Sequence, residues 1–165
     1  MSRVYIPGLI HDEAAPYTAW MKYVVYGIPL LLLVIGLILI PIDIEETYVM
    51  LCDAVLIGLI FYFVMVRRYQ IFGDRIKIVL GGPFRVNVPF SNIKELQPAG
   101  GYKSMAYSGL RLATTSRNIV EIRRKKGPGI VISPANRDMF IEQYRLAKKA
   151  YDQMYPETNN GKMRD

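Results

Sequence analysis

Residues 23–42 read YVVYGIPLLLLVIGLILIPI, and residues 48–66 read YVMLCDAVLIGLIFYFVMV. The first stretch has 20 residues and no charged side chain, and the second has 19 residues and one charge, Asp53. At about 1.5 Å of rise per residue, a helix of either length covers the roughly 30 Å hydrocarbon core of a bilayer. The two stretches therefore predict two transmembrane helices, and the short connection between them makes the pair an antiparallel hairpin.

Charge is unevenly distributed along the 165 residues. Residues 1–66 carry two basic and six acidic side chains, whereas residues 67–165 carry 19 basic and 8 acidic ones. Lys22 precedes the hairpin, Arg67 and Arg68 follow it, and the loop between the spans has no Lys or Arg. Because basic residues next to spans favour the cytoplasmic side, we expect a multi-pass inner-membrane protein with both termini and the polar domain in the cytoplasm.

The composition argues against several classes of function. Cys52 is the only cysteine and His11 the only histidine, so the sequence predicts no disulfide framework, no metal site and no Ser-His-Asp hydrolase. The carboxylates after the second span show no paired acid–base pattern, and no P-loop is present. We therefore expect a protein that is not an enzyme, without catalytic residues or cofactors. A membrane tether explains the positive charge without nucleic-acid binding.

After Arg68 the sequence changes to short β-type runs separated by turn residues. Alternating side chains in Arg75–Leu80 and Phe84–Pro89 predict two half-buried strands, and Arg124–Gly129 predicts a hairpin tip. Further strand candidates are Tyr69–Phe72, Ser91–Gln97 (a strand or a turn), Leu110–Thr114, Asn118–Arg123 and Ile130–Ile132.

A helix is predicted to follow these strands. Ser133 is the expected N-cap and Pro134 the first helical residue, and Pro156 ends the helix. One apolar stripe at spacings of three and four residues would face the domain: Phe140, Tyr144, Ala147, Tyr151 and Met154.

Residues 70–145 resemble the bacterial pleckstrin-homology-like (bacterial PH) domain family, in its membrane-anchored type with two N-terminal transmembrane helices. The resemblance rests on Gly73–Ile78, Gly81–Arg85, Val88–Leu96, Val131–Pro134 and Met139–Gln143. It implies a small α+β domain, in which antiparallel strands form a sandwich or partly open barrel with one C-terminal helix. It implies no catalytic residue and no defined ligand.

The predicted organisation has four parts. Residues 1–20 form a cytoplasmic juxtamembrane segment that could lie against the membrane surface. Residues 21–66 form the transmembrane hairpin, residues 69–155 the PH-like domain, and residues 156–165 a disordered tail.

Basic residues are the candidate surface for a partner or for the membrane. The densest cluster is Arg123, Arg124, Lys125 and Lys126, and Arg67–Arg68 directly follows the second span. Such a cluster on a tethered domain could touch anionic lipid headgroups. The alternative is a solvated hairpin tip together with the ordinary bias of basic residues toward the cytoplasm.

Asp53 is the candidate intramembrane polar residue. A carboxylate inside a span suggests ion or proton handling. The alternative is that Asp53, five residues from Tyr48 and thus about 7.5 Å into the span, reaches the headgroups near the outer face.

These observations favour a non-catalytic binding or scaffold protein. It would recognise a protein or peptide partner at the cytoplasmic face, with a contribution from anionic lipids. The alternative is a small regulatory subunit of a membrane transport or envelope-lipid complex, in which the spans carry the function. The sequence does not indicate whether the protein forms homo-oligomers.

Overall fold

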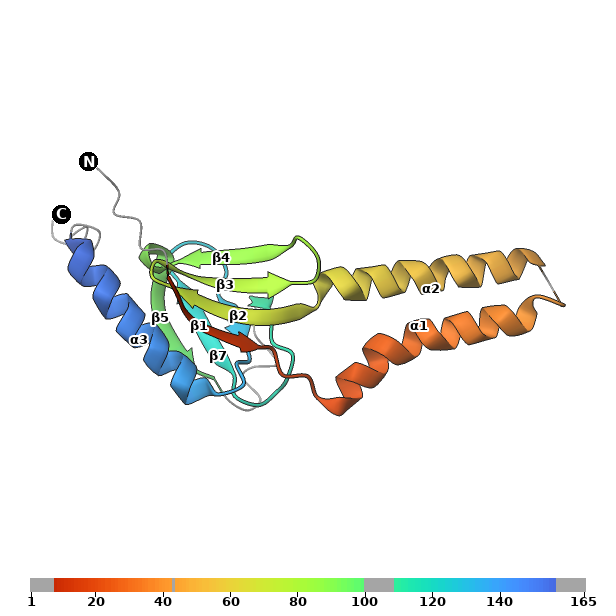
Figure 1. Ribbon diagram of the computed structural model, residues 1–165, viewed down its shortest axis with the longest axis horizontal. Coiled ribbons are helices and arrows are strands. Elements are labelled where there is room, and N and C mark those ends of the chain that lie inside the picture. The colour runs from red at the N-terminus through yellow and green to blue at the C-terminus, as the bar shows by residue number, and fades with distance from the viewer. Residues whose placement is uncertain (1–7, 43, 100–108, 157–165) are drawn as a thin grey trace. The chain divides into compact units, whose positions relative to one another are not determined.

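The computed structural model describes residues 8–42, 44–99 and 109–156. These residues form two compact units, one built around two long helices and the other around the strands and a third helix. The elements in chain order (Figure 1) are β1 Leu9–Ala14, α1 Ala19–Leu39, α2 Ile44–Val64, β2 Val66–Phe72, β3 Arg75–Leu80, β4 Arg85–Pro89, the 3-10 turn η1 Phe90–Asn92, β5 Ile93–Pro98, β6 Leu110–Arg111, β7 Val120–Arg124, β8 Ile130–Ile132 and α3 Arg137–Met154.

The helical unit is a hairpin of two 21-residue helices, α1 and α2. The helices approach closely at Gly36, where an added Cβ would lie 3.2 Å from Leu51 Cδ2. Thr47 and Ala54 are the buried residues of α2. Only 6 % and 11 % of the most apolar windows of α1 and α2 are buried, whereas a core helix of a soluble protein would be mostly buried. Both helices are long and apolar enough to cross a membrane.

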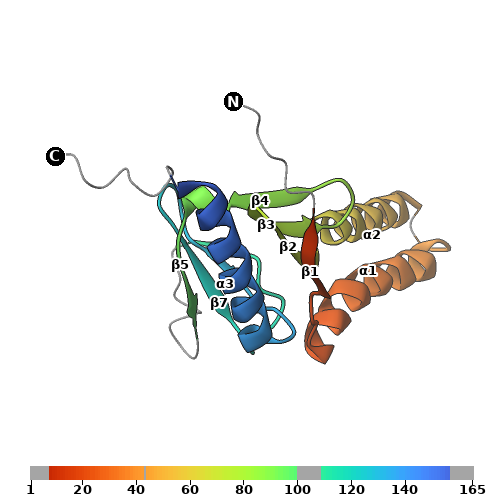
Figure 2. The ribbon, with the colours of Figure 1, turned by 60° about the vertical axis from the view of Figure 1, so that its left-hand side comes forward.

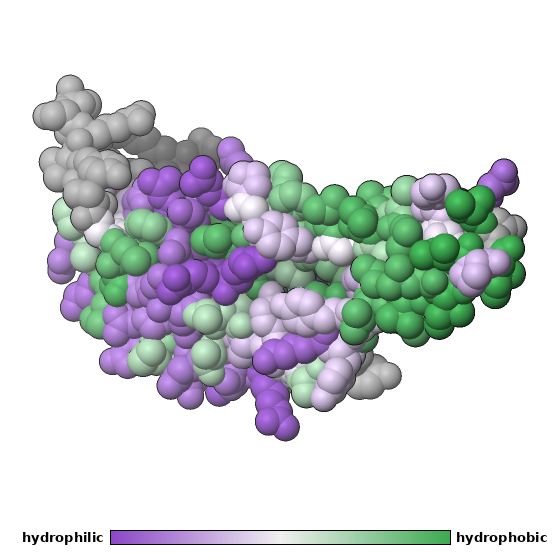
Figure 3. Space-filling view, turned by 45° about the vertical axis from the view of Figure 1, so that its right-hand side comes forward, coloured by the Kyte–Doolittle hydropathy of each residue, from purple (hydrophilic) through white to green (hydrophobic). Residues whose placement is uncertain are grey.

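Both helices begin about four residues before the predicted spans. α1 starts at Ala19, and α2 starts at Ile44 with Glu45 and Glu46 in its first turn. Acidic side chains favour a helix N-terminus because the backbone N–H groups there carry partial positive charge. At its other end α2 stops at Val64, and Val66 is a buried residue of β2 instead of the last residue of the span. Figure 3 shows hydrophobic side chains gathered over the helices.

The second unit contains two four-stranded sheets. Their strand orders are β1-β2-β3-β4 and β5-β7-β8-β6. All the strand pairings recorded are antiparallel except that between β6 and β8. Apolar side chains from both sheets and α3 form the core, among them the fully buried Tyr69, Ile71, Ile76, Ile78, Phe90, Ile122, Ile130 and Phe140. The predicted fold class, a helical hairpin followed by a PH-like α+β domain, is confirmed.

Strand β1 was not predicted by the sequence analysis. It lies in the segment predicted as juxtamembrane, and it pairs antiparallel with β2 from Leu9↔Phe72 to Ala14↔Arg68. The ladder continues into Ala15, whose N–H donates to the Arg67 carbonyl at 2.9 Å. His11 and Glu13 pair with Ile71 and Tyr69, the two fully buried residues of β2. Because two polar residues occupy those positions, the apolar alternation that marks other strands is missing.

Helix α3 lies along one side of the domain (Figure 2). It contacts β1 and β2. Phe140, Tyr144 and Ala147 of the predicted stripe are buried, Tyr151 is half-buried, and Met154 is exposed. The rings of Tyr144 and Tyr151 both meet Phe90 edge-on, at centroid distances of 5.4 and 5.7 Å.

The predicted N-cap at Ser133 is wrong. Asn136 caps α3, since its side-chain oxygen accepts a hydrogen bond from Met139 N at 3.1 Å. Ser133 Oγ instead accepts from the backbone N–H groups of Thr114 and Thr115, at 2.8 and 3.2 Å. Because the Ser133 hydroxyl is already bonded to the backbone of Thr114 and Thr115, the N-cap lies three residues later, at Asn136. The tail prediction falls on residues 157–165, outside the described residues.

Candidate binding surface

Arg67 and Arg68 lie in β2 and do not form a linker. Arg68 makes a bidentate ion pair with Asp12 of β1, with Nε to Oδ1 and Nη2 to Oδ2 distances of 2.9 Å each. This pair crosses the β1–β2 ladder and stabilises it. The Arg68 guanidinium is therefore engaged within the first sheet, and its role toward a partner stays a prediction.

The predicted basic cluster divides into two kinds of residue. Arg123 pairs with Glu121 at 3.0 Å, and Arg124 Nε donates to the Pro128 carbonyl. Lys125 and Lys126 are exposed in the turn between β7 and β8, as the predicted hairpin tip requires.

Asn92 fixes the backbone of this turn. It accepts from Lys125 N through its carbonyl at 2.8 Å and from Lys126 N through its side chain at 2.9 Å. Gly127 completes the turn at φ +89°, a conformation that favours glycine. The two lysine side chains therefore project from a rigid tip. Arg67 and Arg68 belong to the other sheet, so the six predicted residues do not all lie on one sheet.

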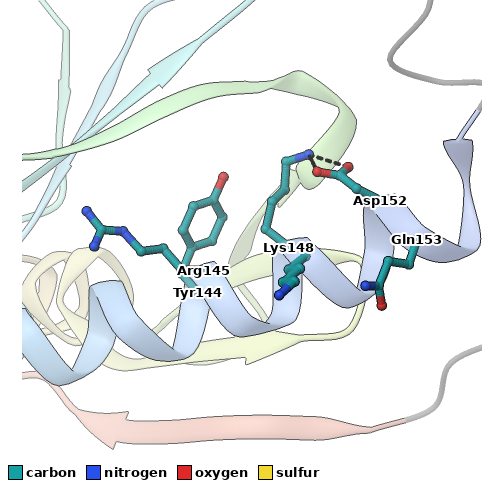
Figure 4. Close-up of a pocket in the computed structure, with 6 residues that line it drawn as sticks. Tyr144, Arg145, Lys148, Asp152 and Gln153 are labelled. Atoms are coloured by element: carbon teal, nitrogen blue, oxygen red, sulfur yellow. Dashed lines mark hydrogen bonds and ion pairs between the residues drawn. The ribbon is translucent and has the colours of Figure 1, made fainter.

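A hollow of about 520 Å³ runs along one face of α3 (Figure 4). It is lined by side chains at helical spacings of one, three and four residues: Tyr144, Arg145, Lys148, Lys149, Asp152 and Gln153. Lys148 Nζ bonds both oxygens of Asp152, at 2.5 and 2.8 Å, so the one carboxylate of the hollow is already neutralised. Arg145 and Lys149 are exposed and make no ion pair with any described residue. The hollow is therefore cationic.

Tyr144 forms the inner wall of this hollow. Burial raises the pKa of the Tyr144 phenol, and the nearby Asp152 carboxylate raises it further. The hydroxyl therefore stays neutral and can donate or accept a hydrogen bond. The sequence analysis did not nominate any residue of the hollow as a site. The signal was present in the spacing of Arg145, Lys148 and Lys149, which places three cations on neighbouring positions of one helical face.

A second polar feature lies beneath α3. His11 Nε2 and Glu13 Oε2 are 3.5 Å apart on β1, and their side chains are only 13 % and 9 % exposed. The His11 ring meets Phe140 of α3 edge-on at 6.0 Å. Burial raises the pKa of the Glu13 carboxyl, while His11 and the backbone of Asn136 and Ala135 oppose that rise. Among the described residues, no three His, Cys, Asp or Glu side chains are grouped as a metal site would require.

Asp53, the predicted intramembrane residue, is exposed on α2. Its helix begins at Ile44, which places Asp53 one residue before the midpoint of the 21-residue element. The structure therefore places the carboxylate deeper in its helix than the span predicted from Tyr48 did.

Comparison with known proteins identifies the family. Residues 67–148 match the sequence model described as "Bacterial PH domain". No curated protein and no solved structure shows significant similarity to the chain. The matched residues run from the second residue of β2 through β8 and include most of α3, whereas β1 precedes them. The resemblance stated from the motifs is thus confirmed, and residues 67–148 form a domain of the bacterial PH family.

Proposed function

We propose that this protein is a membrane-tethered, non-catalytic binding module whose bacterial PH domain holds an acidic protein or peptide segment in the hollow along α3. The observation that carries the proposal is the excess of cations there. Arg145 and Lys149 face solvent, while the single carboxylate is occupied by Lys148. A groove beside a helix is a common peptide site, and the buried Tyr144 ring supplies an apolar wall for it.

Strand pairing supports the proposed membrane topology. β1 lies before α1 and β2 lies after α2, yet Ala14 and Arg68 are partners in one ladder. Two paired residues must lie on the same side of a bilayer, so the hairpin would cross it twice and return. The excess of basic residues after the hairpin favours the cytoplasm as that side. The protein would then be a multi-pass inner-membrane protein with its PH domain in the cytoplasm.

The rigid tip offers a second candidate function, contact with anionic headgroups. Lys125 and Lys126 are exposed on a turn that Asn92 fixes, whereas Arg123 and Arg124 are bonded within the domain. Each cation near an anionic leaflet contributes about 1 kcal/mol, so the two lysines would contribute about 2 kcal/mol. This contribution would orient the domain without defining its partner.

The test is affinity purification of the full-length protein from its own membranes in gentle detergent, followed by mass spectrometry. Arg145→Glu/Lys149→Glu reverses the two exposed charges of the hollow. Arg85→Glu/Lys94→Glu is the matched control, because it changes net charge equally on two exposed strand positions outside the hollow. We expect recovery of the co-purified partner to fall at least tenfold in the first variant and to stay unchanged in the control. Equal retention or equal loss in both would contradict the assignment of the site to α3.

The lipid contact is measured separately. Lys125→Ala/Lys126→Ala should lower flotation of the domain with vesicles containing anionic lipid and leave partner recovery unchanged. The two readouts therefore distinguish a peptide site on α3 from a headgroup site at the tip.

A further inference from the structure

Asp53 lies inside the apolar part of α2. It follows Glu46, the last charged residue of the first turn, by seven positions, or about 10 Å of helix. An aspartate side chain has a single methylene, so it cannot extend that distance to the headgroups as a lysine or arginine would. A carboxylate held at this depth requires a hydrogen-bond donor or a cation beside it.

The hairpin itself supplies no such partner. Asp53 makes no hydrogen bond or ion pair with any described residue, and its side chain is exposed on α2. The face of α2 that packs on α1 contains Leu51 and Ala54, and Leu51 lies against Gly36. From Val49 onward the exposed strip that includes Asp53 is otherwise apolar, with Val49 and Leu56 one turn away and Ile60 two turns away.

A second copy of the chain would not supply a partner either. From Gly27 to Leu39, α1 has only apolar side chains, so it offers no donor at any depth near Asp53. From Val49 to Val64, α2 offers only the Cys52 thiol, which is a weak donor, and the Tyr62 hydroxyl near its opposite end. A copy of α2 would present another Asp53, and like charges disfavour that contact.

We propose that Asp53 is the docking residue for a transmembrane helix of a different protein, one that places a basic side chain at the depth of Asp53. The apolar strip around Asp53 would pack against the same helix. This surface is separate from the hollow on α3, although it depends on the membrane insertion that the proposed function includes. It would make the protein a subunit of a membrane complex with the protein that contributes this helix.

The single cysteine of the chain is a natural probe for this surface. Cys52 is exposed and adjacent to Asp53. A photoactivatable maleimide attached to Cys52 of the full-length protein, in its own membranes, would crosslink whatever lies on the strip. Carbonate extraction is done first, since release of the protein would show that membrane insertion itself has failed. The variants are Asp53→Leu, Asp53→Asn and the control Val55→Leu, and Cys52→Ser gives the background.

The expected result is one stoichiometric adduct, mapped to a transmembrane segment with a Lys or Arg. It should fall at least tenfold in Asp53→Leu, fall less in Asp53→Asn and persist in Val55→Leu. Replacing that Lys or Arg in the partner should abolish the adduct in the same way. An adduct between two copies, an adduct with lipid alone, or an adduct insensitive to Asp53 would overturn the proposal. Arg145→Glu/Lys149→Glu should leave the adduct intact, so the two interfaces are tested independently.

Discussion

At the scale of single residues, the least expected feature is Glu13. Its side chain is 9 % exposed, its Oε1 has no hydrogen-bond partner among the described residues, and His11 Nε2 lies 3.5 Å from its Oε2. Desolvation raises the pKa of Glu13 above its ordinary value of 4.5. The folded domain therefore binds a proton more readily than the unfolded chain does, and ionising Glu13 costs stability.

Glu13→Gln tests this cost. As pH rises from 4.5 through the raised pKa of the folded state, the wild-type domain should lose stability because the unfolded chain gives up its proton first. The glutamine variant keeps the shape of the side chain but has no carboxyl to ionise, so it does not lose stability in this way. We expect its melting temperature to exceed that of wild type at pH 7 and the difference to disappear near pH 4. A difference that grows toward low pH would contradict a raised pKa.

The same residue explains why the sequence analysis did not predict β1. Strands were recognised by apolar residues alternating with polar ones, as in Arg75–Leu80 and its buried Ile76 and Ile78. In Leu9–Ala14 the residues that face the core are His11 and Glu13. A histidine and a carboxylate in those positions are stabilised by Phe140 and by the start of α3, which are distant in sequence. A local pattern contains no such information.

At the scale of elements, Gly36 sets the spacing of α1 and α2. An added Cβ would lie 3.2 to 3.4 Å from Leu51 and Met50, whereas Gly27 on the same helix has no atom within 4 Å of that position. Gly36→Leu should therefore destabilise the hairpin by about 1–3 kcal/mol through overpacking, and Gly27→Leu should not.

The measurement is the loss of helical circular dichroism during titration of the mixed-micelle protein with sodium dodecyl sulfate. The Gly27 variant shares the gain in side-chain size and the loss of a helix-interior glycine. A similar shift of both midpoints would show that the helices do not pack at Gly36.

Element by element, prediction succeeded where the signal is local. The two apolar stretches, the strand Arg75–Leu80 and the stripe through Phe140, Tyr144 and Ala147 were visible as composition or period. The start of α3 was not, because Ser133 is used by Thr114 and Thr115 and leaves the cap to Asn136. The hollow on α3 was missed for a related reason. The spacing of its cations is local, but the exposure of Arg145 and Lys149 in the folded domain is not a local property of the sequence.

At the scale of the whole molecule, the hairpin is an insertion between two paired strands. Without β1, the edge of β2 is exposed and Phe140 loses its ring contact with His11. We therefore expect residues 66–156 alone to be less stable, and more prone to aggregate, than a version in which residues 8–15 are joined to Val66 by a short glycine-containing turn.

Thermal unfolding and size-exclusion chromatography of the two soluble versions compare them directly. The joined version should unfold cooperatively at the higher temperature and elute as a monomer. If both versions have the same melting temperature, β1 contributes nothing to the domain and its pairing with β2 is unimportant for stability.

The order β1–α1–α2–β2 also sets a sequence of events during synthesis. β1 leaves the ribosome before the hairpin, and its partner strand follows only after residues 15–65 have been made, which takes roughly 3–10 s at about 5–20 residues per second. Throughout that interval the strand that pairs with β1 has not yet been made. If the hairpin is threaded into a bilayer, Ala14 and Arg68 can meet only when both helices have crossed it in opposite directions. Closure of the first sheet would then signal that both crossings are finished, and a chain with only one crossing would be left with an open sheet for quality-control proteases to recognise.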